Sequence, residues 1–224
     1  MGAKRRRSYE GKPQRPEVAR PATGETFLIV VEGKATEPAY LKRIRAKLNL
    51  KAFAVEIVHG DHTDPIGIVK EAIDLRDRQA AKAGKSAVTE PFDRTWVVFD
   101  RERQNHHRRE EMPKALELAA AHGIEVALSI PTFEYWLLLH YDFTTKAFDG
   151  CKAAVKALKK FIAQYDKGDL PLDELIPKVG QAVRHAQKCR KHWDGAGGDK
   201  NPSTDVDLLI VALSAAAHED CRFG

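Results

Sequence analysis

The fold class is decided by Phe27-Leu28-Ile29-Val30-Val31-Glu32-Gly33, where an unbroken apolar run stops on a carboxylate and a glycine. The run is rich in β-branched residues and has no polar alternation, which is typical of a strand buried on both faces of a parallel sheet. A second run, Thr95-Trp96-Val97-Val98-Phe99, stops in the same way on Asp100-Arg101-Glu102. The two runs therefore predict two buried parallel strands, each of which brings acidic side chains to its carboxyl end.

Strand and helix patterns continue to alternate along the first two thirds of the chain. Further strands are predicted over 53–58 and 124–128. Helices are predicted after the first three strands, starting with Thr36 as an N-cap, near Ile66 and near Glu110. This alternation indicates βαβ units, so we predict an α/β fold with a mainly parallel sheet flanked by helices.

The chain changes character after about residue 145. Residues 151–165 and 174–193 have the apolar periodicity of amphipathic helices, and Ser203-Thr204 is interpreted as the cap of a last helix. We therefore predict three parts, which are a basic disordered arm (1–22), an α/β core (23–145) and a C-terminal helical extension packed on that core (146–224).

The net charge of +5 comes entirely from the amino-terminal arm. Residues 1–22 contain seven Lys or Arg and two Glu, whereas the rest of the chain has 30 basic and 30 acidic residues. A Pro- and Gly-containing segment with so few apolar residues is expected to be disordered. It either contacts nucleic acid through phosphate charge or serves as a solubilising tail.

Other features of the composition argue against several classes of protein. No run approaches the roughly 18 apolar residues of a membrane helix, and the basic start of the chain lacks the apolar segment of a secretory signal. The three cysteines lack Cys-x-x-Cys spacing, which argues against a disulfide framework and against a zinc site. We therefore expect a cytoplasmic protein that does not associate with membranes.

The main candidate site consists of Glu32, Asp100 and Glu102. In open α/β sheets ligands collect at the carboxyl ends of the strands. Carboxylates from neighbouring strand ends can share Mg²⁺ or Mn²⁺, which bind through one or two carboxylates plus substrate phosphates. Such a cation neutralises phosphate charge and orients a hydroxide for attack. The alternative is that these acids are solvated turn residues.

Glu134 is a further candidate, because an unpaired carboxylate is costly to bury in its apolar segment. It is either another metal ligand or acid/base group, or the partner of a core arginine. His140, at the end of the same segment, is interpreted as a helix C-terminal cation. Lys34 does not complete a P-loop, which would need a glycine where Leu28 stands, so it either contacts phosphate or is a solvated loop lysine. The other candidates for phosphate contact are basic: Arg101, His106, Arg108 and Arg109.

Four sequence blocks together resemble the RloB-like family, a group of Toprim-related proteins found beside restriction–modification and phage-defence loci. The blocks are residues 29–41, 96–102, 129–140 and 201–206. The third is similar to the family's Ser-Asn-Pro-x-Phe-Glu-x-Trp-Leu-Leu-Leu-His block, with Ile130 in place of the Asn. The resemblance extends from residue 26 to about residue 213.

The resemblance implies a Toprim-like (Rossmannoid) fold and a metal-dependent nuclease. Toprim domains pair a Glu after the first strand with an Asp-x-Asp after the third, and use them with Mg²⁺ to break phosphodiester bonds. The matching positions here are Glu32, Asp100 and Glu102, the last of which is one methylene longer than the usual Asp. The resemblance also implies a role in phage defence or abortive infection, with DNA or RNA as substrate and an AAA/ABC-type ATPase as partner.

Two other functions remain open. The protein could be a non-catalytic subunit that binds nucleic acid or the ATPase, or a housekeeping enzyme such as one that matures ribosomal RNA. A topoisomerase is disfavoured because nothing beyond the Toprim-like core supplies a strand-attacking tyrosine domain. A primase is disfavoured by the missing zinc ribbon.

Overall fold

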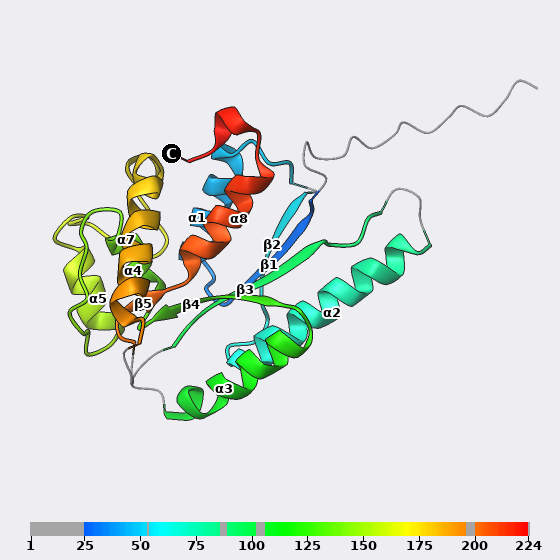
Figure 1. Cartoon of the computed structure of the whole chain (residues 1–224), viewed down its shortest axis with the longest axis horizontal. Helices are drawn as coiled ribbons and strands as arrows, with labels where there is room; N and C mark the ends of the chain where they lie inside the picture. Colours follow the sequence, from blue (N-terminus) through cyan, green and yellow to red (C-terminus); the bar gives the residue numbers. More distant parts are fainter. Residues whose placement is uncertain (1–24, 53, 86–88, 102–105, 196–199, 224) are drawn as a thin grey trace, which may run out of the picture.

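Five strands form a single sheet in the order β2-β1-β3-β4-β5 (Figure 1). The strands are β1 (Phe27–Val31), β2 (Val55–His59), β3 (Arg94–Asp100), β4 (Glu125–Ile130) and β5 (Ser203–Thr204). The first four pair in parallel, and β5 is antiparallel to β4. The computed structural model describes residues 25–52, 54–85, 89–101, 106–195 and 200–223, without the side chains of 106–109. The predicted α/β class with a mainly parallel sheet is confirmed.

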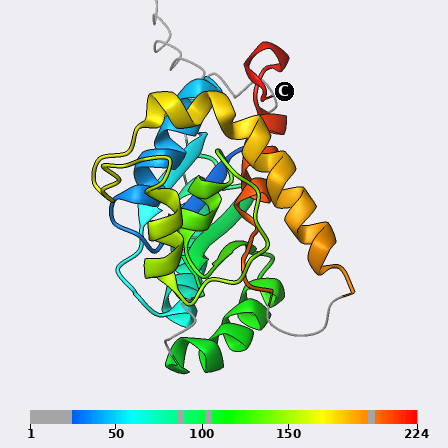
Figure 2. The ribbon, with the colours of Figure 1, turned by 90° about the vertical axis from the view of Figure 1, so that its left-hand side faces the viewer.

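Helices cover both faces of this sheet (Figure 2). Helices α2 and α3 pack on one face, and α1, α4, α7 and α8 lie on the other. The helical elements are α1 (Thr36–Lys47), α2 (Pro65–Ala83), α3 (His106–Ala121), α4 (Phe133–Leu138), α5 (Cys151–Leu158), α6 (Leu172–Leu175), η1 (Ile176–Lys178), α7 (Val179–Trp193), α8 (Val206–Ala216) and η2 (Glu219–Cys221). Among the helices in the described ranges, none has the length and apolarity needed to cross a membrane.

The uniformly apolar sequence of β1 is explained by burial on both faces. Phe27, Ile29 and Val31 belong to the apolar cluster that also includes residues of α1, α4, α7 and α8. Leu28 and Val30 belong to the second cluster, together with residues of α2 and α3. All five side chains are at most 1% exposed. A polar side chain left unpaired at one of these positions would cost about 1–3 kcal/mol.

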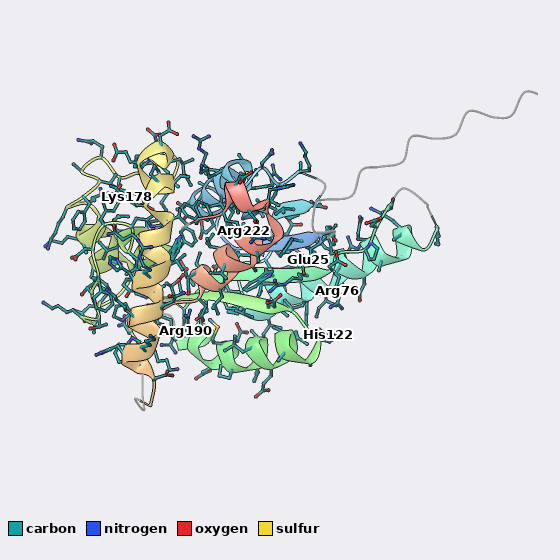
Figure 3. The ribbon with its side chains drawn as sticks, turned by 45° about the horizontal axis from the view of Figure 1, so that its top comes forward. Glu25, Arg76, His122, Lys178, Arg190 and Arg222 are labelled. Atoms are coloured by element: carbon teal, nitrogen blue, oxygen red, sulfur yellow. The ribbon has the colours of Figure 1, made fainter. Side chains whose placement is uncertain are left out.

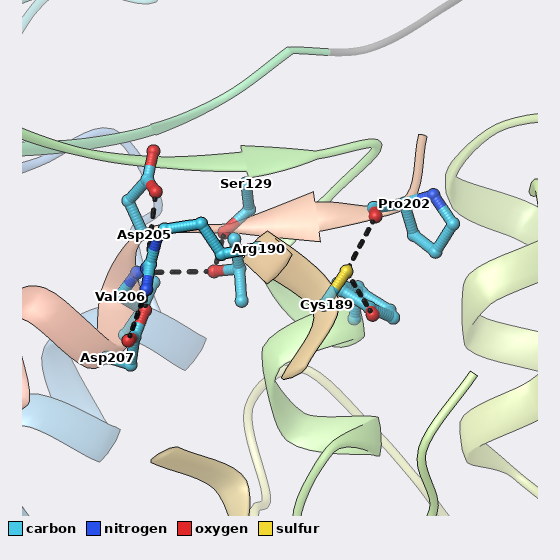
Figure 4. Close-up of polar contacts among 9 residues, drawn as sticks. Ser129, Cys189, Arg190, Pro202, Asp205, Val206 and Asp207 are labelled. Atoms are coloured by element: carbon cyan, nitrogen blue, oxygen red, sulfur yellow. Dashed lines mark hydrogen bonds and ion pairs between the residues drawn. The ribbon is translucent and has the colours of Figure 1, made fainter. Parts of the chain in front are cut away.

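Polar contacts hold the C-terminal part of the chain against the sheet (Figure 4). Ser129 Oγ lies 3.1 Å from Thr204 Oγ1, which joins β4 to β5. On α7, Arg190 Nη2 donates to Asp207 Oδ1 at 2.6 Å, and the side chain of Asp207 is 1% exposed. Residues beyond 145 therefore supply one strand of the sheet and much of the larger apolar cluster.

Several predicted element boundaries are wrong. The second strand begins at Val55, and the helix predicted from Glu110 begins at His106. The helix predicted over 151–165 ends at Leu158, after which the chain continues in turns. The helix predicted over 174–193 is instead divided into α6, η1 and α7, because Pro177 lacks the N–H that a continuous helix would need.

Two capping predictions are also wrong. Thr36 is the first residue of α1, and its hydroxyl donates to the carbonyl of Lys167 at 3.0 Å instead of capping the helix. Ser203-Thr204 forms β5, although Thr204 Oγ1 still accepts the N–H of Val206 at 3.3 Å. In both cases the threonine hydroxyl has a partner far away in the sequence, which the local pattern does not contain.

Candidate acidic site

The carboxyl ends of β1 and β3 bring Glu32 and Asp100 together. The two strands are neighbours, with Val31 opposite Val98. The backbone N–H of Glu32 donates to the carbonyl of Val98 at 3.0 Å, which extends the pairing by one residue. The backbone N–H of Asp100 in turn donates to Glu32 Oε2 at 3.4 Å. Two of the three predicted metal ligands therefore lie side by side at this edge, and both are partly buried.

Thr132 connects Asp100 to Glu134. Strand β4 lies next to β3, with Ser129 opposite Asp100, and the chain turns at Pro131 into α4. This turn places Thr132 Oγ1 2.9 Å from Asp100 Oδ2 and in a hydrogen bond with Glu134 Oε2. Glu134, in the first turn of α4, is 2% exposed. Glu134, the further candidate, is therefore joined to Asp100 through a single hydroxyl.

The other oxygen of Glu134 faces the segment after α5. Tyr165 donates its hydroxyl to Glu134 Oε1 at 2.9 Å, and Lys167 Nζ lies 3.4 Å from the same atom. The core arginine considered as a partner is not found among these contacts, because the cation is a lysine whose side chain is 69% exposed. A carboxylate with a cation that reaches in from the surface can exchange that partner for another positively charged group.

A fourth carboxylate, Glu37, belongs to the same group and was missed by the sequence analysis. It lies in the first turn of α1, and Gly33 packs so closely that a Cβ there would lie 1.9 Å from Glu37 Oε2. Burial raises the pKa of Glu37, and the charges of Glu134 and Glu32 raise it further. The sequence did contain a signal for Glu37. A helix that follows a parallel strand starts at the carboxyl edge of the sheet, so an acid in its first turn lies near the strand-end acids.

Asp100 is unusually hard to ionise. Burial raises the pKa of Asp100 well above its usual range, and the charges of Glu37 and Glu134 raise it further. Hydrogen bonds from the Phe133 N–H and the Thr132 hydroxyl oppose this rise. The Thr132 hydroxyl has one proton, so it donates to one carboxylate at a time. When Thr132 donates to Glu134, a proton on Asp100 can be donated to the Thr132 oxygen. The raised pKa of Asp100 favours this protonated form.

The chemistry of this group suits a hard divalent cation. Carboxylate oxygens are the ligands that Mg²⁺ prefers, and a cation would relieve the repulsion that raises the pKa of Asp100. Within the described ranges, no three His, Cys, Asp or Glu side chains are grouped so that they could hold a metal ion as they stand. Glu102, the third predicted ligand, lies outside the described residues. Glu32 and Asp100 are therefore the predicted ligands that can be placed.

The predicted phosphate-binding residues follow the same strands. Lys34 is exposed two residues after Glu32, and the backbone N–H of Arg101 donates to the carbonyl of Ser129 at 2.8 Å. Three others lie in the first turns of α3, where the backbone is described but the side chains are not: His106, Arg108 and Arg109. The basic arm, 1–22, lies outside the described residues.

The interpretation of His140 as a helix C-terminal cation is wrong. The side chain is fully buried, and burial lowers its pKa to about 4. Its Nδ1 lies 3.0 Å from the carbonyl of Trp136, which can only accept, so Nδ1 carries the proton. The hydroxyl of Tyr40 then donates to Nε2 at 2.9 Å. His140 is therefore a neutral part of the core.

The sheet order and the carboxylates gathered at its carboxyl edge define a mostly parallel α/β protein with an acidic candidate site. The chain matches a family model described as "RloB-like protein" over residues 27–213, and therefore belongs to the RloB-like protein family. This match confirms the resemblance seen in the sequence. No curated protein and no solved structure matches the chain.

Proposed function

We propose that this protein is a metal-dependent nuclease that cleaves phosphodiester bonds of DNA or RNA at the acidic edge of its sheet. The observation that carries the proposal is the contact between Glu32 and Asp100 at adjacent strand ends. Asp100 is also coupled electrostatically to the buried Glu134. The Toprim-like arrangement implied by the family resemblance assigns the same two strand ends to the metal.

In this proposal Glu32, Asp100 and Glu102 hold Mg²⁺ or Mn²⁺. When bound, the cation would neutralise phosphate charge and lower the pKa of a water molecule. Thr132 holds the carboxylate of Asp100 in place through its hydroxyl. The raised pKa of Asp100 supports the assignment, because a partly buried carboxylate close to other acids is stabilised strongly by a divalent cation.

Glu134 is proposed as the acid/base group of the reaction. It is almost fully buried, yet one of its oxygens faces Lys167, which reaches it from the surface. Tyr165 fixes the orientation of the carboxylate through its hydrogen bond to Glu134 Oε1. Basic residues around the site contact the substrate phosphates in this proposal, and they are Lys34, Arg101, His106, Arg108 and Arg109.

The family resemblance further supports a role in phage defence or abortive infection, with an AAA/ABC-type ATPase as partner. We propose this role together with the nuclease activity. In a host that carries the complete locus, the Glu32→Gln variant is expected to lose protection against phage. Full protection by that variant would contradict a defence role that depends on cleavage.

The nuclease proposal is tested by measuring cleavage of single- and double-stranded DNA and RNA with Mg²⁺, with Mn²⁺ and with chelator. Glu32→Gln and Asp100→Asn are expected to lower cleavage at least 10²-fold, on the order expected for loss of a transition-state contact. Glu56→Gln is the matched control, because Glu56 is an exposed acid on the edge strand β2. Equal activity of Glu32→Gln and Glu56→Gln would refute the proposal.

One feature favours the alternative, a non-catalytic subunit that binds the ATPase. Leu208 and Val211 on α8 are 43% and 46% exposed. Val211 lines a groove between α7 and α8, which has a volume of about 390 Å³ and includes Ile210 and Phe223 in its lining. Exposed apolar side chains beside a groove are typical of protein-binding surfaces. Full function of the Glu32→Gln variant, together with its loss in Val211→Glu, would favour this alternative.

A further inference from the structure

Four exposed lysines form a row along α5 and the turn that follows it. The segment 151–165 contains four lysines and no acidic residue. Its apolar residues, such as Ala154 and Leu158, face the core. We call the four exposed residues the lysine row, which consists of Lys152, Lys156, Lys159 and Lys160. Among the described side chains, no acid lies within ion-pair distance of a member of the row.

One end of the segment that carries the lysine row contacts the acidic site, and the other end lies against the turn beside it. At its start, Cys151 Sγ lies 4.0 Å from the carbonyl of Pro131, the residue before Thr132. At its end, the hydroxyl of Tyr165 donates to Glu134. Figure 2 faces α5 and shows it on the side to which the strands point. The segment that carries the exposed lysine row is therefore held beside the acidic site at both of its ends.

An exposed aromatic side chain adjoins the row. Phe161 follows Lys160 directly and is 43% exposed. Its ring stacks on Tyr141, with the ring centroids 5.3 Å apart and the planes 15° from parallel. The ammonium of Lys178 lies 3.9 Å from the centre of the Tyr141 ring, on the side of the molecule that carries α5 (Figure 3). Lys178 thus contacts the Tyr141 ring of the stacked pair, while the Phe161 side chain remains exposed to solvent.

We propose that the lysine row binds the phosphate backbone of a single nucleic-acid strand at the acidic site, and that Phe161 stacks on one of its bases. The proposal rests on the proposed function, because it treats the acidic site as the place where that strand is cut. The helical rise from Lys152 through the turn to Lys160 makes the row about 12 Å long, so its four charges lie close enough together to neutralise successive phosphates of one strand. Lysines that follow a backbone next to an exposed aromatic ring are the usual means of binding single strands.

An acidic protein partner fits these features less well. A protein interface is expected to have an apolar centre surrounded by polar groups. The lysine row offers Phe161 as the exposed large apolar residue of its segment. Its charges are also arranged in a line, which suits a polymer with regularly spaced phosphates.

The test measures binding of fluorescent 20-nucleotide single strands of DNA and of RNA, and of the matching duplexes, over a series of salt concentrations. Chelator is present throughout, so that binding is measured without cleavage. The row variant is K152Q/K156Q/K159Q/K160Q. The matched control is K47Q/K51Q/K82Q/K85Q, which removes the same charge. These exposed lysines precede β2 and β3, so they lie towards the amino ends of the strands, away from the acidic site at the carboxyl ends. Melting temperatures establish that both variants are folded.

The row variant is expected to bind single strands at least tenfold more weakly at 50 mM salt than the wild type. Its slope of log K against log salt should be smaller by about 2–3, because each lost phosphate contact removes about 0.7. The control should change the slope by less than 1. Phe161→Ala should weaken single-strand binding by about fivefold to a hundredfold without a change in slope, because stacking does not depend on salt.

Equal slopes for the row variant and the control would overturn the proposal and leave the row as a solvated helix face. Equal loss of duplex and single-strand binding, with no effect of Phe161→Ala, would overturn the single-strand assignment. Displacement of the strand by poly-glutamate as readily as by unlabelled nucleic acid would assign the row to acidic proteins instead. If the row variant loses binding while the wild type shows no cleavage with Mg²⁺ or Mn²⁺, the proposed function fails and the binding surface stands.

Discussion

Tyr165 and Glu134 meet inside the molecule, where the tyrosine hydroxyl donates to Glu134 Oε1 at 2.9 Å. The two residues come from segments 31 positions apart in the chain, and their contact joins the stretch after α5 to the first turn of α4. A carboxylate buried to this extent depends on such donors, because each hydrogen bond to a charged group replaces a lost contact with water.

Tyr165→Phe is therefore expected to lower the free energy of unfolding by about 1.5–3 kcal/mol, the usual contribution of a hydrogen bond to a charged group. Urea unfolding monitored by tryptophan fluorescence measures this change. Tyr141→Phe is the matched control, because the Tyr141 hydroxyl is buried and has no hydrogen-bond partner in the described part of the chain. Its removal should be neutral or slightly stabilising. Equal effects of the two substitutions would show that the Tyr165 hydrogen bond contributes nothing specific.

Glu134→Gln separates catalysis from structural support. The amide can still accept the Tyr165 hydroxyl, and the lost partner Lys167 is largely exposed, so the stability should change by at most about 1 kcal/mol. Cleavage should nevertheless fall by a factor of about 10²–10⁴, the usual scale for a lost acid/base group. Melting temperature and cleavage are measured on one preparation. A destabilised protein whose remaining folded fraction is fully active would contradict the catalytic role.

Metal binding should be visible in the stability of the protein. A ligand that binds only the folded state stabilises it, so Mg²⁺ or Mn²⁺ at a hundredfold excess over Kd should raise Tm by on the order of 5–10 °C. Asp100→Asn should abolish the shift, because it removes a ligand whose charge the cation would offset. Glu56→Gln should leave the shift unchanged. A normal shift in Asp100→Asn would place the metal elsewhere.

The sequence predicted those parts of the site that the strands position directly. Glu32 and Asp100 each follow a fully apolar run, and the carboxyl ends of neighbouring parallel strands have to meet at one edge. Glu37 was missed because Thr36-Glu37-Pro38 has the composition of an ordinary helix start. That local pattern gives no sign that the backbone of Gly33 packs against the Glu37 carboxylate.

The contacts from the C-terminal part of the chain could not be predicted in the same way. Tyr165 reaches Glu134 from a turn that follows α5, and the sequence pattern had placed that residue inside a longer helix. The position of such a turn depends on how the surrounding helices pack. β5 was likewise missed, because a strand of two residues is recognisable only through its partner β4. Local periodicity therefore predicted the sheet and its acids, and tertiary packing decided what surrounds them.

His140 gives a pH prediction whose sign follows from its burial. Its pKa is about 4 in the folded protein and near 6.5 in an unfolded chain, so the unfolded chain binds the additional proton between these values. The contribution of His140 to stability is therefore fully present above about pH 6.5 and is lost as the pH falls towards 4. The loss over this range amounts to about 3 kcal/mol. Urea unfolding between pH 4.5 and 7.5 measures it.

His140→Gln removes the titrating group while leaving an amide that can still contact the Tyr40 hydroxyl and the carbonyl of Trp136. The rest of the protein contributes equally to the pH dependence of both proteins, so the informative quantity is the difference between them. That difference should shrink on acidification, because only the wild type loses the contribution of a buried neutral imidazole. His185→Gln serves as the control, since its ring is only partly buried and contacts the carbonyl of Leu139. Stability curves of wild type and His140→Gln that run parallel from pH 7.5 to 4.5 would show that His140 is not held neutral by the core.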